Sequence, residues 1–153
     1  MSESTSVVAP TTTRVSEHTP PEINAWIEKE TDERLAVYLA ASPDAIDERL
    51  QQLDREWDIE RVLEANASTL ALAGTLLGMT TSRKFLVLPA MVAGFLLQHA
   101  IQGWCPPVTF FRRRGFRTAR EIEDERIALK ALRGDFDDLP KEDVSALMSA
   151  VRR

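Results

Sequence analysis

The sequence predicts an all-α protein in which two short apolar helices form a transmembrane hairpin, flanked by amphipathic cytoplasmic helices and preceded by a disordered N-terminus. Three observations support this fold class: a long stretch with almost no charge, an apolar stripe with helical spacing before it, and a start that is poor in large apolar residues. The expected divisions are a disordered tail (1–20), acidic amphipathic helices (21–61), the hairpin (62–107), and a basic juxtamembrane segment with C-terminal helices (108–153).

The 43 charged residues are distributed unevenly along the chain. Residues 65–111 contain only Arg83 and Lys84, whereas the average density would give about 13 charges in a window of this length. A charge placed in hydrocarbon costs several kcal/mol unless it pairs or reaches the interface. Because the two cations divide the window, we expect membrane helices at about 65–82 and 85–102.

Each apolar run is short for a membrane span. A helix over 65–81 would measure about 26 Å, against a hydrocarbon thickness of about 30 Å. Short apolar runs also occur in the core helices of water-soluble proteins. An alternative is therefore a soluble helical bundle with the two apolar segments as a central buried hairpin.

Small residues recur at a spacing of four in both apolar runs. Gly74 and Gly78 form one such pair, and Ala90 and Gly94 form another. This spacing lets helix backbones approach closely in lipid, where no hydrophobic force drives helices together. We expect these four residues to form helix-packing faces.

The cations around the two predicted spans indicate an orientation. Eight arginines flank the outer ends (49, 55, 61, 112, 113, 114, 117 and 120), and two cations lie in the loop between the helices. Since Lys and Arg concentrate on the cytoplasmic side, both termini are expected in the cytoplasm. Arg112, Arg113 and Arg114 either set this topology or also contact anionic lipid headgroups.

The segments outside the hairpin read as solvated helices. Ile46, Leu50, Leu53 and Trp57 form one apolar stripe. It either pairs with another helix or packs against the preceding helix, which contains Ile23, Ile27, Leu35 and Tyr38. Residues 22–64 hold 13 acidic and 5 basic side chains, a surface suited to the cytoplasm and to a protein partner there. After the hairpin, helices are expected at about 119–133 and from about residue 140 onward.

Composition and motifs limit the classes of function. The net charge of −5 argues against a nucleic-acid partner, because phosphate neutralisation needs a basic face. Residues 1–20 lack an apolar run of signal-peptide length. The chain contains no phosphate-binding loop, serine-nucleophile motif or metalloprotease signature, so no cofactor and no enzymatic activity are expected.

One pair of residues suggests chemistry. His99 and Cys105, the single cysteine, lie near the end of the second apolar run. Imidazole and thiolate ligands suit zinc, copper or iron, although two ligands do not complete a tetrahedral site within one chain. A metal-dependent or thiol-redox membrane protein is thus an alternative, against Cys105 simply packing as a small apolar residue.

Residues Gly103, Trp104, Cys105 and Pro106 form a Gly-x-Cys-Pro element directly after the second apolar run. Together with the two apolar segments, this element resembles the YgaP-like inner-membrane domain family over about 64–107. The resemblance implies a two-helix membrane hairpin in a bacterial inner membrane, self-association, and no defined biochemical role. That family's namesake has a rhodanese domain with a catalytic cysteine before the hairpin, whereas residues before 64 contain no cysteine here. We therefore expect a non-enzymatic module that binds the lipid bilayer and forms a homo-oligomer or binds a cytoplasmic partner.

Overall fold

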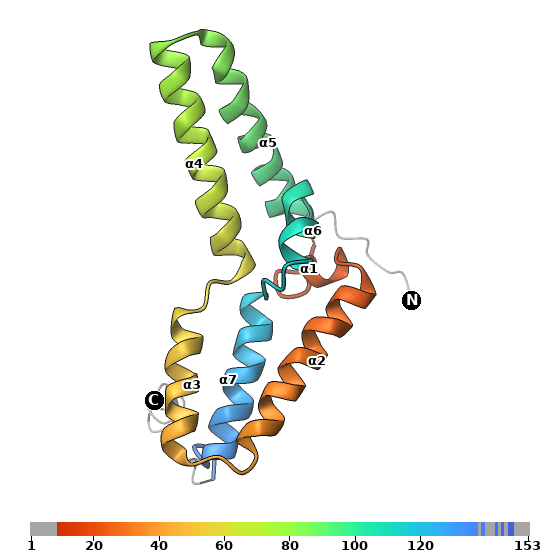
Figure 1. Cartoon of the computed structure of the whole chain (residues 1–153), viewed down its shortest axis with the longest axis vertical. Helices are drawn as coiled ribbons and strands as arrows, with labels where there is room; N and C mark the ends of the chain where they lie inside the picture. Colours follow the sequence, from red (N-terminus) through yellow and green to blue (C-terminus); the bar gives the residue numbers. More distant parts are fainter. Residues whose placement is uncertain (1–8, 138, 140–142, 144, 146, 149–153) are drawn as a thin grey trace. The chain divides into compact units, whose positions relative to one another are not determined.

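The computed structural model describes residues 9–137 together with 139, 143, 145, 147 and 148. The helices are α1 (Arg14–Glu17), α2 (Pro21–Tyr38), α3 (Pro43–Arg55), α4 (Ile59–Thr80), η1 (Arg83–Leu86), α5 (Val87–Gln102), α6 (Pro106–Arg112) and α7 (Ala119–Arg133) (Figure 1). Among the described residues there is no strand, which confirms the all-α class. The helix expected from about residue 140 lies mostly outside the described residues.

The chain forms two compact units. The first unit combines Met1–Ile27 with Trp57–Arg120 and includes α1, α4, η1, α5 and α6. The second unit combines Glu28–Glu56 with Glu121–Arg153 and includes α3 and most of α2 and α7.

The core of the second unit is built on the expected apolar stripe. Ile46, Leu50 and Leu53 of α3 are buried together with Ile122 and Leu129 of α7. Leu35 and Tyr38 of α2 contact the same cluster. Ile46, Leu50 and Leu53 thus pack with α7 and α2, whereas Trp57, the fourth residue of the predicted stripe, lies beyond the end of α3 and is exposed.

A buried carboxylate links the helices of the second unit. The Glu125 side chain on α7 is fully buried, and Arg49 Nε donates a 2.8 Å hydrogen bond to its Oε1 atom. Arg34 of α2 lies 3.7 Å from the Oε2 atom. Because a buried charge is stable only when it is paired, three helices are fixed around one acidic side chain.

A second ion pair lies at the end of α7. Arg133 donates to Asp135 and to Asp47 of α3, and this guanidinium holds the pKa of Asp135 below its usual range. A carboxylate with a lowered pKa stabilises the fold at neutral pH, and the stabilisation is lost as the pH falls through that lowered value.

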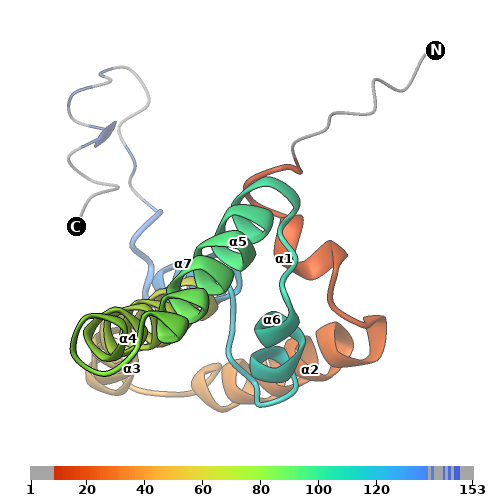
Figure 2. The same cartoon turned by 90° about the horizontal axis from the view of Figure 1, so that it is seen from above.

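The first unit contains the two predicted membrane helices. α4 and α5 lie side by side and are joined through η1 (Figures 1 and 2). α4 begins at Ile59, earlier than the predicted start near 65, because the Asp58 side chain caps the helix by accepting a 2.7 Å hydrogen bond from Arg61 N. The helix therefore begins about six residues before the predicted membrane segment.

The charged residues Glu60, Arg61 and Glu64 lie in the first six positions of α4, so its uncharged part (65–80) is about 24 Å long, still short of a hydrocarbon layer of about 30 Å. The whole of α4, 22 residues, measures about 33 Å. η1 and α5 together reach a similar length, about 32 Å, because the 3₁₀ turn rises more steeply per residue. By length and composition, two helical stretches can cross a membrane: one within Pro43–Thr80 and the other Arg83–Gln102.

Two of the four predicted packing residues lie between α4 and α5. A Cβ atom at Gly74 would stand 2.7 Å from the Pro89 side chain, and one at Gly78 would stand 2.4 Å from Leu86. Pro89 occupies the first turn of α5, where a missing N–H breaks no intrahelical bond. By contrast, Gly94 has no atom within 4 Å of its Cβ position, so it does not contribute to this contact.

The N-terminal segment differs from the predicted disordered tail. Residues 1–8 lie outside the described residues, but residues 9–20 are ordered and contain α1. Val15 is buried in a core cluster with Ile59, Leu63, Cys105 and Val108. A single buried valine and several polar contacts thus hold a segment whose composition is otherwise typical of a loop.

Breaking the Glu125 pair should destabilise the second unit strongly. We expect Glu125→Gln to lower the free energy of unfolding by about 3–5 kcal/mol, since two arginines would lose their buried counter-charge. Urea unfolding followed by far-ultraviolet circular dichroism in detergent measures this loss. The matched control is Glu123→Gln, which removes an exposed 3.0 Å pair with Arg126 and should cost less than about 1 kcal/mol. Equal effects of the two substitutions would contradict the role given to Glu125.

Candidate functional site

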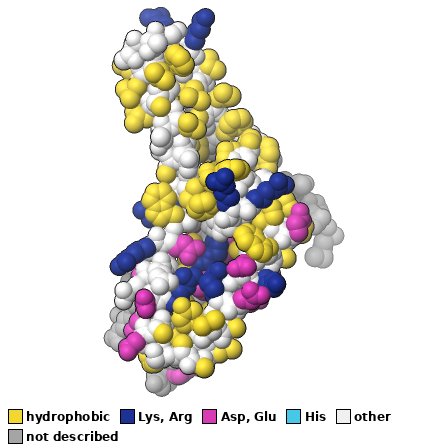
Figure 3. Space-filling model, in the orientation of Figure 1, with side chains coloured by type: hydrophobic (Ala, Val, Ile, Leu, Met, Phe, Trp, Pro, Cys, Tyr) yellow, Lys and Arg dark blue, Asp and Glu magenta, His cyan; other side chains and the backbone are white. Residues whose placement is uncertain are grey.

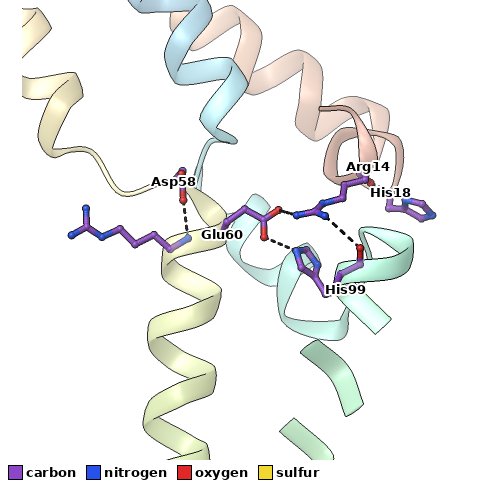
Figure 4. A network of polar contacts seen from close by, with 7 residues as sticks. Arg14, His18, Asp58, Glu60 and His99 are labelled. Atoms are coloured by element: carbon purple, nitrogen blue, oxygen red, sulfur yellow. Dashed lines mark hydrogen bonds and ion pairs between the residues drawn. The ribbon is translucent and has the colours of Figure 1, made fainter. Parts of the chain in front are cut away.

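A polar network lies at the base of the α4–α5 pair, the end away from η1. Glu60, on the first turn of α4, accepts a 3.0 Å hydrogen bond from Arg14 at Oε1 and lies 2.7 Å from His99 Nε2 at Oε2. Figure 4 shows the carboxylate between the Arg14 guanidinium and the His99 ring. One acidic side chain therefore connects α1, α4 and the last turn of α5.

The N-terminal segment completes the end of α5. Helix C-termini leave carbonyl groups without intrahelical partners. Here Ala9 N donates to Ile101 O at 3.1 Å, and the Arg14 side chain donates to Ala100 O at 3.4 Å. A cation at this position also interacts favourably with the helix dipole. These contacts explain why residues 9–20 are ordered.

Gly103 makes the approach of α1 possible. It ends α5 in the left-handed conformation, with φ of 74°, and its N–H donates to His99 O at 2.7 Å. A Cβ atom here would lie 2.4 Å from the Arg14 Cβ atom. Glycine is required at position 103 for two reasons: the backbone has a positive φ, and the Arg14 backbone approaches closely.

The other residues of the predicted Gly-x-Cys-Pro element have separate positions. Trp104 is partly exposed, Cys105 is buried in the core cluster with Val15 and Val108, and Pro106 begins α6. Proline is well suited to this first helical position because its fixed φ is already helical.

The structure brings His99 and Cys105 together. Both side chains are buried, and the thiol lies beside the imidazole. Nε2 of His99 faces Glu60, whereas Nδ1 is buried without a hydrogen-bond partner among the described residues. No group of three or more His, Cys, Asp or Glu side chains in the described part of the chain is placed to hold a metal ion.

The predicted arginine triplet divides into two kinds of residue. Arg112 is fully buried, and its guanidinium donates to Thr19 Oγ1 at 3.2 Å, Asn24 Oδ1 at 2.8 Å and Phe116 O at 3.0 Å. Arg113 and Arg114 are exposed. The expectation of headgroup contact was therefore wrong for Arg112, because it shares a helix face with buried Val108.

Sequence reasoning missed Glu60 and Arg14. Glu60 could have been found from its position: it lies a few residues before the first apolar run, and His99 lies near the end of the second apolar run. In antiparallel helices these two positions lie at one level. Arg14 gave no comparable signal, because nothing in its surroundings predicted an ordered segment.

Substituting Gly103 should release the N-terminal segment. We expect Gly103→Ala to cost at least about 1–2 kcal/mol from the left-handed backbone, in addition to the clash with Arg14. The measurement is the rate of tryptic cleavage after Arg14, which should rise severalfold. Gly94→Ala is the matched control, since its Cβ meets open space. Unchanged protection in Gly103→Ala would show that α1 docks differently.

The described geometry defines a structural network and a close His99–Cys105 pair, and neither specifies a reaction. The resemblance to the YgaP-like pattern depends on the four residues 103–106 and stays a prediction. Comparisons of the chain with protein-family models, with curated proteins and with solved structures find no match.

Proposed function

We propose that this chain is a small integral membrane protein whose α4–α5 pair crosses the bilayer as a helical hairpin. Both termini lie in the cytoplasm, and the membrane is a bacterial inner membrane, as the resemblance implies. The protein acts as a non-enzymatic module that associates with further copies and offers its acidic second unit to a cytoplasmic partner. The observation that supports this proposal most strongly is the exposed apolar surface of the pair.

The exposed surface of the α4–α5 pair is formed largely by apolar side chains. Thirteen large apolar side chains between residues 70 and 101 are exposed: Leu70, Leu72, Leu76, Leu77, Met79, Phe85, Leu86, Val87, Met91, Phe95, Leu96, Leu97 and Ile101. Figure 3 shows apolar side chains along the pair and cationic side chains at its far end. Proteins in water rarely expose apolar patches beyond a few hundred Å². Lipid is the solvent that such a surface matches.

The polar side chains within α4 are also compatible with lipid. Thr69, Thr75 and Thr80 each donate to the carbonyl four residues earlier, at 2.7, 2.8 and 2.8 Å. Ser68 and Asn66 make the same kind of bond to Glu64 O and Val62 O. A hydroxyl or amide bonded within its own helix avoids the cost of an unsatisfied polar group in hydrocarbon.

The small residues support two different contacts. Gly74 and Gly78 are already used between α4 and α5. Ala90 and Gly94 are exposed on α5, and the space beyond Gly94 is open. Self-association therefore uses the Ala90–Gly94 face, where a second backbone can approach closely.

Cysteine labelling tests both insertion and orientation. In a Cys105→Ser background, which removes the single native cysteine, Ser82→Cys lies in the loop before η1 and Ser42→Cys lies before α3. We expect a membrane-impermeant maleimide added to intact cells or spheroplasts to label the Ser82→Cys protein, and to label the Ser42→Cys protein only after permeabilisation.

Alkaline carbonate washing provides the control for this experiment. The protein should stay with the membrane pellet if α4 and α5 cross the bilayer. Release into the supernatant, or equal labelling of both positions before permeabilisation, would contradict the proposed hairpin.

A bulky residue at Gly94 should prevent self-association. We expect the unmodified protein to be a dimer or larger species by light scattering in detergent, and Gly94→Ile to shift it to monomer. Ala73→Ile, on an exposed part of α4 outside the small-residue face, should leave the oligomer intact. A strictly monomeric unmodified protein would eliminate the self-association part of the proposal.

A further inference from the structure

A groove lies between α4, α5 and α6 in the first unit. Its volume is about 330 Å³, at the lower end of the range of about 300–1,000 Å³ for small-ligand sites. Leu63, Ala67 and Leu70 of α4, Leu88 and Leu96 of α5, and Phe111 of α6 are among the residues that form its walls. We call it the α6 groove.

The lining of the α6 groove is almost entirely apolar. Asn66 is the one polar residue among the side chains that form it, and its amide donates a 2.8 Å hydrogen bond to Val62 O within α4. The groove therefore has little to offer a polar ligand. A narrow hydrocarbon chain fits it better, because such a chain needs no hydrogen-bond partner along its length.

The groove runs along the membrane-crossing part of the pair. Leu88 and Leu96 lie eight residues apart on α5, which corresponds to about 12 Å along the helix axis. Pro106, Pro107 and Phe111 of α6 line the groove at the base of the pair. An occupant would thus extend from the interface toward the interior of the bilayer.

Two exposed cations follow directly on the groove wall. Arg113 and Arg114 come immediately after Phe111 and Arg112, and the Arg114 guanidinium lies 4.2 Å from the centre of the Phe110 ring. Within the described part of the chain, neither arginine forms an ion pair. Their charge is therefore available to an anionic group at the same end of the groove.

We propose that the α6 groove binds one acyl chain of an anionic phospholipid, with the lipid phosphate held by Arg113 and Arg114. This inference rests on the proposed membrane location. The apolar walls receive the chain, and the two arginines select the headgroup. The nearby acidic residue Glu64 is exposed on α4 and is outnumbered by these cations.

The headgroup provides the selectivity. Lipid tails are as apolar as the groove, so an acyl chain gains only packing contacts when it enters from the bilayer. Each cation near the membrane surface favours an anionic lipid by about 1 kcal/mol, so two correspond to a preference of about tenfold or more.

The experiment uses the full chain reconstituted in phosphatidylcholine vesicles with a trace of spin-labelled phosphatidylglycerol or spin-labelled phosphatidylcholine. Electron paramagnetic resonance measures the motionally restricted fraction of each label. We expect phosphatidylglycerol to be favoured about tenfold. Ala67→Phe, which fills the groove, should remove most of the restricted fraction that exceeds the ordinary annulus, whereas Ala73→Phe on the exposed side should not.

A second variant tests the headgroup without altering the apolar walls. Arg113→Gln combined with Arg114→Gln should abolish the preference for phosphatidylglycerol, whereas the matched pair Arg83→Gln and Lys84→Gln at the opposite end should retain it. Equal restriction of the two lipids by the unmodified protein would overturn the inference. The inference would also be overturned if Ala67→Phe changed the oligomeric state of the protein but left its lipid preference intact. That result would mean that a second copy of the chain fills the groove.

Carbonate washing distinguishes failure of this inference from failure of the proposed membrane location. Protein that stays in the pellet without a lipid preference refutes only the lipid-binding inference, whereas protein that is released refutes the membrane location.

Discussion

In the proposed membrane orientation, the arrangement of the first unit depends on the cost of placing a charge or an unsatisfied polar group in hydrocarbon. Every charged side chain of α4 lies within its first six residues, and α5 has none. The two cations between the helices lie in η1, which the proposed orientation places at the far interface. Hydroxyl groups that remain within α4 bond to carbonyls of the same helix. The exposed apolar surface and the placement of charges at both ends are two consequences of this one cost.

At the base of the pair, which the proposed orientation places at the boundary between lipid and water, charged groups must be neutralised. Glu60 is paired with Arg14 on one side and with His99 on the other. The same contact orders the N-terminal segment, which in turn provides partners for the last carbonyl groups of α5. Gly103 allows this arrangement by leaving space for the Arg14 backbone. A short polar segment thereby becomes part of the first unit, although its own sequence has little tendency to fold.

The elements that the sequence predicted well are those fixed by local patterns. Charge depletion located α4 and α5, and apolar spacing located the buried face of α3, because both patterns depend on solvent preference along one element. Contacts between distant segments were not accessible in this way. The order in residues 9–20, the Arg14–Glu60 pair and the burial of Glu125 each depend on a partner that lies more than 40 residues away. The start of α4 at Ile59 was also not predicted, because the capping residue Asp58 lies before the charge-depleted stretch from which the helix was located.

The arginine run after α5 illustrates how one sequence feature serves two purposes at different stages. In the folded unit Arg112 is buried and bonded to Thr19 and Asn24, so it offers no charge to lipid headgroups. The positive-inside bias, however, acts on Lys and Arg near the ends of spans while the orientation of the chain is being set. At that stage the contacts with Thr19 and Asn24 need not exist, and Arg112 counts equally with Arg113 and Arg114. The cation count and the burial of Arg112 are therefore compatible. In the proposed membrane protein, topology depends on the unfolded run, whereas lipid contact in the folded protein depends on the two arginines that stay exposed.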